Sequence, residues 1–80
     1  MRLDKYLKVS RIIKRRTIAN DACDAGRILV NGKAARASYT VKTGDIITVN
    51  LGSNAHEYQV KKIAETVKKE EADTLYTLLK

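Results

Sequence analysis

The sequence contains no proline, tryptophan or phenylalanine, and only one cysteine and one histidine among its 80 residues. A lone Cys23 excludes an intramolecular disulfide, which fits a reducing cytosol. Cys23 and His56 together cannot complete a zinc site, and no glycine-rich phosphate loop is present. No run of residues is apolar enough for a signal peptide or a membrane span. We therefore expect a cytoplasmic protein that is not an enzyme and that needs no cofactor and no metal.

What the chain does contain is positive charge, and this charge is unevenly distributed. The net charge is +7. Residues 1–16 hold seven Lys or Arg and one Asp, residues 17–36 hold three basic and two acidic residues, and residues 37–80 hold six of each sign. A solvated charged surface usually mixes both signs, whereas a segregated basic patch is typical of a protein that binds a polyanion.

The N-terminal third of the chain has the spacing of short helices. Apolar residues predict a helix over residues 2–7, a break near Val9–Ser10, and a second helical turn over residues 11–15. The next helix is expected to begin with Thr17 as its N-cap and to end at Gly26. Its buried stripe would consist of small or apolar residues, namely Ile18, Ala19, Ala22 and Cys23.

Beyond Gly26 the pattern changes to strands and turns. Asn31-Gly32 is the strongest turn signal in the chain and follows an apolar run, which predicts a hairpin. Gly44-Asp45 should precede a strand over residues 46–51, and alternation predicts a third strand starting near His56. From Glu65 to Lys80 the apolar spacing predicts an amphipathic C-terminal helix.

These elements predict an α+β fold in which short N-terminal helices pack on a small, mostly antiparallel sheet. Eighty residues allow one domain with a small core, and 44% hydrophobic content is enough for folding. We expect a single domain over residues 1–80, with a core motif over 1–51 and a C-terminal strand and helix over 52–80.

The segment "RLDKYLKVSRIIKRRTIANDACDAGRILVNGKAARASYTVKTGDIITV" resembles the RNA-binding domain named after bacterial ribosomal protein S-four, also called the alpha-L motif. The resemblance covers residues 1–51 and depends on the order and spacing of several features. These are Arg2-Leu3-Asp4, Ser10-Arg11, the helix that ends in Gly26, Val30-Asn31-Gly32 and Gly44-Asp45. The resemblance implies an S-four-like fold that binds RNA.

The opening "RLDKYLKVSRIIKRRT", the ending "KKEEADTLYTLLK" and the short length are similar to the RqcP family of ribosome-associated quality-control factors. That resemblance implies binding to an obstructed large ribosomal subunit, with contacts to its rRNA and to the P-site peptidyl-tRNA. It also implies support of an NEMF-type (RqcH) tailing factor, which adds alanine to stalled chains without mRNA. The protein would act as a monomer and away from membranes.

Ten residues are candidates for RNA binding. Arginine suits bidentate contacts to phosphate, and lysine acts as a point charge. In the family fold the Asn31-Gly32 turn lies beside the helices, so basic residues after it would extend the same groove. The scarcity of aromatic residues favours structured RNA, which is recognised by shape and backbone, over stacked single strands. The candidates are Arg2, Lys5, Lys8, Arg11, Lys14, Arg15, Arg16, Thr17, Lys33 and Arg36.

Some residues in and around this set have two interpretations. On a helical turn, Arg11, Lys14 and Arg15 would share one face. Asp4 either holds an arginine in position or complements the helix dipole. Tyr6 is expected to pack inside rather than stack on a base, and Tyr39 is a weaker stacking candidate. The four lysines of the neutral half are expected to face solvent: Lys61, Lys62, Lys68 and Lys69.

Other functions remain open from the sequence. One is a heat-shock-type S-four-like protein that recycles large subunits, a group that usually has a longer basic C-terminal extension; another is a general rRNA-binding protein. A DNA-binding helix-turn-helix would have to read bases with Asn20, Asp21 and Asp24, which suit a major groove poorly. A membrane-surface helix would be interrupted near Val9–Ser10 and again at Thr17.

Overall fold

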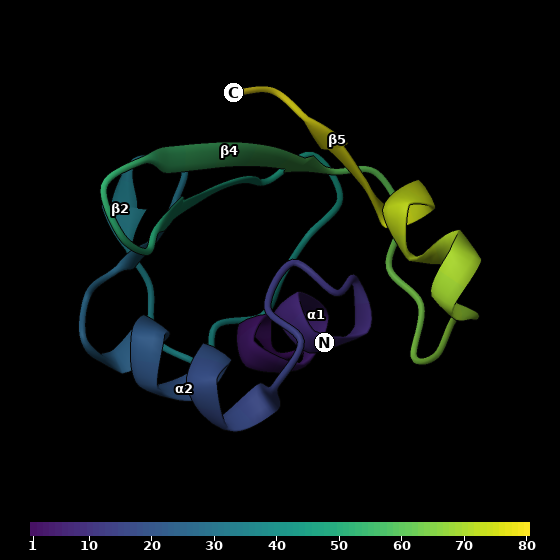
Figure 1. Cartoon of the computed structure of the whole chain (residues 1–80), viewed down its shortest axis with the longest axis horizontal. Helices are drawn as coiled ribbons and strands as arrows, with labels where there is room; N and C mark the ends of the chain where they lie inside the picture. The colour runs from purple at the N-terminus through teal and green to yellow at the C-terminus, as the bar shows by residue number, and fades with distance from the viewer.

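The computed structural model describes all residues, Met1–Lys80, as two helices packed on one side of a five-stranded antiparallel sheet (Figure 1). The order of the strands in the sheet is β2-β1-β3-β4-β5. This arrangement confirms the predicted α+β class. In chain order the elements are α1 Leu3–Val9, α2 Arg16–Asp24, β1 Ile28–Val30, β2 Lys33–Ala34, β3 Ile46–Asn50, β4 Ala55–Val60, the 3-10 helix η1 Lys69–Leu75, and β5 Tyr76–Leu78.

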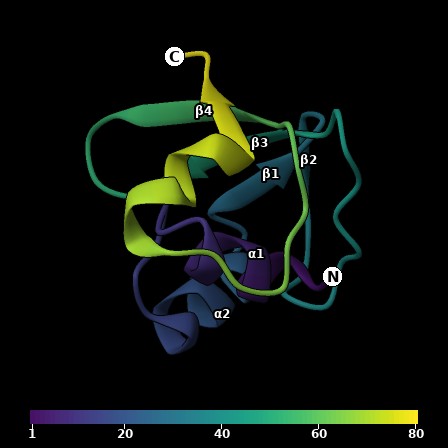
Figure 2. The same ribbon diagram turned by 90° about the vertical axis from the view of Figure 1, so that its right-hand side faces the viewer.

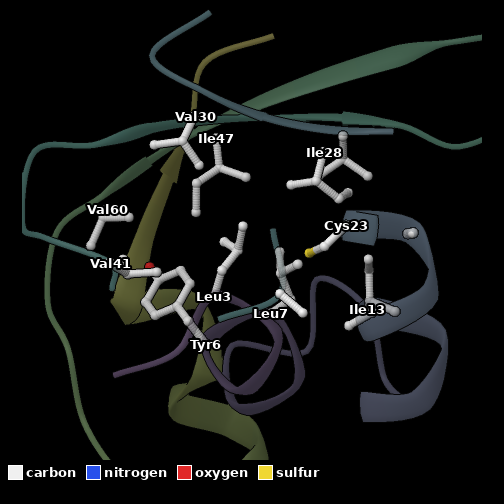
Figure 3. Close-up of a cluster of buried hydrophobic side chains, with 14 of the residues drawn as sticks. Leu3, Tyr6, Leu7, Ile13, Cys23, Ile28, Val30, Val41, Ile47 and Val60 are labelled. Carbon is white, nitrogen blue, oxygen red and sulfur yellow. The ribbon is translucent and has the colours of Figure 1, made fainter. Parts of the chain in front are cut away.

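The core lies between the two helices and the sheet. Alternation along β1 and β3 buries one face of each strand, as period-two patterning requires. Leu3 and Leu7 of α1 are fully buried and point toward Ile28 and Ile47 of the sheet (Figure 3). The same cluster includes Leu75, so the C-terminal part of the chain is packed on the core that the N-terminal part forms.

The link between the helices is not helical, which corrects the predicted turn over residues 11–15. Helix α1 ends at Val9 with Ser10 as its C-cap, and Arg11 has a left-handed backbone with φ of 62°. Ser10 is buried, and its hydroxyl donates a hydrogen bond to the carbonyl of Leu7 at 3.2 Å. Because a left-handed residue stops an α-helix, the side chains that follow Arg11 cannot share one helical face.

Helix α2 begins two residues earlier than predicted, with its N-cap at Arg15 and not at Thr17. Arg15 has the extended backbone of an N-cap, so Thr17 lies inside the helix and the N-cap assignment was wrong. Of the predicted stripe, Ala19, Ala22 and Cys23 are buried, whereas Ile18 is 51% exposed. Small side chains on the buried face let α2 lie close to α1 and the sheet.

The end of α2 and the first hairpin are as predicted. Gly26 has φ of 79°, and its N–H donates to the carbonyl of Cys23 at 3.0 Å, while the N–H of Arg27 donates to that of Ala22 at 3.0 Å. This pair of bonds is the Schellman motif, which needs a left-handed residue at this position. Asn31 and Gly32 have φ of 52° and 85°, the geometry of a two-residue hairpin turn.

The predicted helix over residues 65–80 was wrong in most of its length. Residues 61–68 form no regular element, η1 is a short 3-10 helix, and Tyr76–Leu78 form strand β5 on the free edge of β4. The rings of Tyr58 and Tyr76 meet edge to face at 5.1 Å between centroids. Cross-strand pairing of this kind overrides a helical spacing that the local sequence supports only weakly.

Candidate RNA-binding surface

A buried carboxylate organises the start of α1. Asp4 is 2% exposed, and Arg2 donates to it from Nε at 3.1 Å and from Nη2 at 3.4 Å. Arg16 of α2 donates from Nε at 3.4 Å, and Asn20, one turn later, donates from Nδ2 at 3.2 Å. The N–H of Lys5 completes the set at 2.8 Å. Asp4 thus joins the two helices and gives its arginine partners fixed positions.

The electrostatics of this cluster leave the positive charge at the surface. Burial raises the pKa of the Asp4 carboxyl, but the hydrogen bonds from Arg2 and Asn20 and the charge and hydrogen bond of Arg16 outweigh burial and lower that pKa. The carboxylate is therefore ionised at neutral pH. The side chains of Arg2 and Arg16 are 49% and 48% exposed. Each guanidinium has donors left over after its contact with Asp4, and these can reach a phosphate.

A loop brings Arg36 to the same part of the surface. The N–H of Leu3 donates to the carbonyl of Tyr39 at 2.8 Å, and the N–H of Asp4 donates to that of Ala37 at 3.2 Å. The N–H of Ala37 in turn donates to Oδ1 of Asp24 at 3.2 Å, which ties the loop to α2. Arg36 is exposed and precedes Ala37, so it lies next to the ends of both helices. We call Asp4 and the three side chains that donate to it, Arg2, Arg16 and Asn20, the Asp4 cluster; the Arg36 side chain forms no hydrogen bond or ion pair with it.

A second group of predicted residues lies at the end of α1 and in the link between α1 and α2. Lys8, Arg11 and Lys14 line a pocket of about 190 Å³, together with Val9 and with four residues of the C-terminal half: Glu65, Thr66, Val67 and Lys69. Arg15 is not among the residues that line it. The structure therefore brings together Lys8, Arg11 and Lys14, which differs from the predicted set of Arg11, Lys14 and Arg15.

The remaining candidates are scattered. Lys5 forms an ion pair with Glu65. Arg15 and Thr17 are exposed at the start of α2, and Lys33 is exposed in β2. No hydrogen bond or ion pair joins the side chains of Arg15, Thr17 or Lys33 to either group of basic residues.

Sequence reasoning missed two features of this surface. Asn20 contributes a donor to Asp4, and Lys69 lies beside the pocket that Lys8 borders. No local pattern marks either residue. The Lys5–Glu65 ion pair brings the C-terminal segment to α1. Recognition of Glu65 as the acidic partner of Lys5 would therefore have placed Lys69 near the basic residues of α1 and the link.

The tyrosines and the thiol are used inside the fold. Tyr6 is fully buried and its hydroxyl donates to the carbonyl of Leu75 at 2.6 Å, as its predicted packing role requires. The Tyr39 hydroxyl donates to Asp45 at 2.9 Å. Cys23 is buried, and burial together with the charges of Asp4 and Asp24 raises its pKa to about 11. A thiol in this state is inert as a nucleophile at neutral pH.

No group of three or more His, Cys, Asp or Glu side chains is placed to hold a metal ion. No helix has the length and apolar character needed to cross a membrane. Asp21 and Asp24 are exposed on α2, as the sequence suggested, whereas Asn20 is half-buried and donates to Asp4.

Comparison with known protein families and structures identifies the class of protein to which this fold and its basic N-terminal surface belong. Residues 1–47 match the S4 domain, which is the S-four RNA-binding domain expected from the sequence. The trimeric structure of heat shock protein 15 from Vibrio cholerae superposes with a TM-score of 0.91 at 31% identity, over 99% of this chain and 81% of that one. The molecule is thus an S4 domain protein.

Relatives that match over all of this chain identify one family among the S4 domain proteins. The RQC P-site tRNA stabilizing factor of Bacillus subtilis is 55% identical over 80 residues, which is all of this chain and 93% of that protein. The factor of the same name from Halalkalibacterium halodurans is 51% identical over all of this chain and 91% of its own length. The chain belongs to the family of the RQC P-site tRNA stabilizing factors, as its resemblance to RqcP had indicated.

Proposed function

We propose that this protein binds RNA on the large ribosomal subunit, where it contacts rRNA and the P-site tRNA of an obstructed complex. It would hold peptidyl-tRNA in place while an NEMF-type (RqcH) factor extends the stalled chain with alanine. In this role the protein acts by binding and not by catalysis, as a cytoplasmic monomer with one domain over residues 1–80.

The observation that carries the proposal is the Asp4 cluster. A buried carboxylate positions Arg2 and Arg16 side by side with free donors toward solvent, and this arrangement fits the phosphates of a folded RNA. The hydroxyls of Tyr6 and Tyr39 are hydrogen-bonded within the fold, which supports recognition of RNA shape and backbone over base stacking. Family membership supports the tRNA and the ribosomal site as the RNA in question.

The test is gradient sedimentation of the tagged protein from translating cells, with tRNA measured in each fraction. We expect enrichment on free large subunits that carry peptidyl-tRNA. Distribution over intact ribosomes or small subunits would contradict the quality-control assignment, even if RNA binding remained.

A pair of variants connects this test to the Asp4 cluster. Arg16→Ala removes one exposed arginine of the cluster, and Arg27→Ala removes an exposed arginine outside it, so the net charge changes equally. We expect Arg16→Ala to lose about tenfold in affinity for large subunits. It should also lower the salt slope, which is the steepness with which log affinity falls with log salt concentration, by about one. Arg27→Ala should change affinity less than twofold. Arg27→Ala should keep the wild-type thermal midpoint, whereas Arg16→Ala should stay folded with a slightly lower one, because Asp4 keeps its hydrogen bonds from Arg2, Asn20 and the N–H of Lys5. Equal effects of the two variants would remove Arg16 from the site.

A further inference from the structure

The pocket beside the α1–α2 link is formed by two parts of the chain that are far apart in sequence. Lys8 and Val9 from α1, and Arg11 and Lys14 from the link, form one wall. The segment between β4 and η1, which runs in front of α1 in Figure 2, forms the other wall. From this segment come Glu65, Thr66 and Val67, and Lys69, the first residue of η1, completes the wall.

The charges around this pocket are not balanced within the protein. Four of the lining residues are basic and only Glu65 is acidic. Glu65 already has a partner, because Lys5 forms an ion pair with it from outside the pocket, and that contact lowers the pKa of the Glu65 carboxyl. None of the four basic lining residues takes part in an ion pair, and these residues are Lys8, Arg11, Lys14 and Lys69.

Like charges collected around one cavity repel each other, so an arrangement without internal partners lowers stability until an anion enters. The backbone also fixes the position of one of these basic residues, Arg11. Arg11 has φ of 62°, a left-handed conformation that is strained for a residue other than glycine. Its N–H donates to the carbonyl of Lys8 at 3.0 Å, and the N–H of Ile13 donates to that of Leu7 at 3.1 Å. These bonds hold the link in the shape that places Arg11 and Lys14 at the pocket.

We propose that this pocket is a second RNA contact, in which Lys8, Arg11, Lys14 and Lys69 receive a backbone phosphate and the C-terminal segment forms one side of the site. The inference rests on the proposed function, since the anion is taken to belong to the same RNA. The Thr66 hydroxyl is one more donor for a phosphate oxygen. Lys69, which the sequence placed among solvent-facing lysines, becomes part of the RNA-binding surface.

Neighbouring lysines give a matched test. Lys69 lines the pocket, whereas Lys68 is exposed and does not, so K69Q and K68Q remove the same charge from adjacent positions. The probe is a fluorescently labelled RNA hairpin, with affinity measured by anisotropy at several salt concentrations. We expect K69Q to weaken binding about three- to tenfold and to lower the salt slope by about one, and K68Q to change affinity less than twofold. Equal effects of K69Q and K68Q would overturn the proposal.

Inorganic phosphate separates the RNA backbone from a free anion as the ligand. In an NMR titration, we expect phosphate to shift the amide signals of Arg11, Thr66 and Lys69 and to compete with the RNA hairpin. Phosphate binding without any loss of RNA affinity in K69Q would assign the pocket to a small free anion and overturn the RNA contact.

The Arg16→Ala variant distinguishes failure of this inference from failure of the proposed function. If Arg16→Ala loses affinity and K69Q does not, the pocket is no RNA contact, but the Asp4 cluster still binds RNA. If neither variant loses affinity, the proposed function fails together with the inference. Loss of affinity in both, with K68Q unchanged, supports the two contacts on one RNA.

Discussion

The helical pair and the turns of the sheet are each organised by one buried aspartate, but the two carboxylates hold different kinds of partner. Asp4 is 2% exposed and Asp45 is 8% exposed. The carboxylate of Asp4 is bound by the guanidinium groups of Arg2 and Arg16, which themselves remain half-exposed. The free-energy cost of burying Asp4 is offset by two arginines that still face solvent. The N–H groups of these arginines that do not bind Asp4 are therefore free to bind a ligand.

Asp45 instead accepts three hydrogen bonds from groups of the fold itself. The donors are the Asn31 side chain at 3.1 Å, the Tyr39 hydroxyl at 2.9 Å and the N–H of Lys42 at 2.9 Å. Asn31 also accepts a hydrogen bond from the N–H of Ile46 at 3.0 Å. This network joins the β1–β2 turn to the start of β3, and every donor to the carboxylate is a backbone N–H or a neutral side chain.

The comparison separates two uses of a buried charge. Burying a carboxylate is costly unless its oxygens are bound. When turn backbones and neutral side chains bind it, the result is a rigid connection. When arginines bind it, the result is a positioned binding group, because a guanidinium has five donors and needs only one or two of them for the carboxylate. The two sites therefore differ in what a mutation should remove.

The largest effect is expected on stability at Asp45. Asp45→Ala leaves the donors of Asn31, Tyr39 and Lys42 without their acceptor, and we expect the free energy of unfolding to fall by about 2–4 kcal/mol. Urea denaturation measures this loss. Asp73→Ala, at an exposed position without a hydrogen bond, serves as the control and should stay within about 0.5 kcal/mol of wild type. A loss at Asp45 no larger than at Asp73 would contradict the role of the network.

The next effect is expected on binding at Asp4. Asp4→Asn raises the net charge from +7 to +8, so general electrostatic attraction would tighten RNA binding. If Asp4 positions Arg2 and Arg16, we expect the opposite, a loss of about three- to tenfold in affinity for large subunits.

Asp21→Asn makes the same charge change at an exposed position of α2 and should bind as well as wild type or slightly better. Tighter binding of Asp4→Asn would reduce the Asp4 cluster to a structural feature. Thermal unfolding of both variants, measured in parallel, shows whether a loss of affinity comes from a loss of folded protein.

Several features of the fold could be predicted because a residue type marks the backbone conformation they need. Gly26, Asn31-Gly32 and Gly44 all have positive φ, and each lies where a helix end or turn was expected. Alternation likewise placed β3 and β4 correctly to within a residue or two. These signals are local, and the structure uses them locally.

Two elements could not be predicted, since their conformations depend on distant contacts. Arg11 takes a left-handed backbone without being the glycine or asparagine that usually indicates one. Strand β5 forms because β4 offers a free edge and Leu75 is fully buried in the core, neither of which the spacing over 65–80 reveals. The arrangement of the candidate site likewise depends on distant contacts. Its basic residues could be named, but their division into the Asp4 cluster and the pocket depends on contacts such as Lys5–Glu65, sixty residues apart.

The smallest expected effect is on the titration of the two aspartates. Both pKa values are lowered: burial raises each of them, but the arginines and Asn20 outweigh burial at Asp4, and hydrogen bonds from Lys42, Tyr39 and Asn31 outweigh it at Asp45. Each ionised carboxylate therefore contributes stability that is complete above the unfolded-state pKa of about 3.9 and is lost as the pH falls through the lower folded-state pKa. Chemical denaturation at decreasing pH should show this loss.

Added salt should distinguish the two carboxylates when each is titrated by NMR of its side-chain carbon. Half-exposed guanidinium groups lower the pKa of Asp4, and salt screens charges that face solvent. The pKa of Asp45 is lowered mainly by hydrogen bonds within the turns, which salt affects little. We expect about 1 M salt to move the pKa of Asp4 toward its ordinary value and to leave that of Asp45 nearly unchanged. Equal shifts would mean that both carboxylates depend on the same kind of partner, and the distinction between a positioned binding group and a rigid connection would then lose its electrostatic basis.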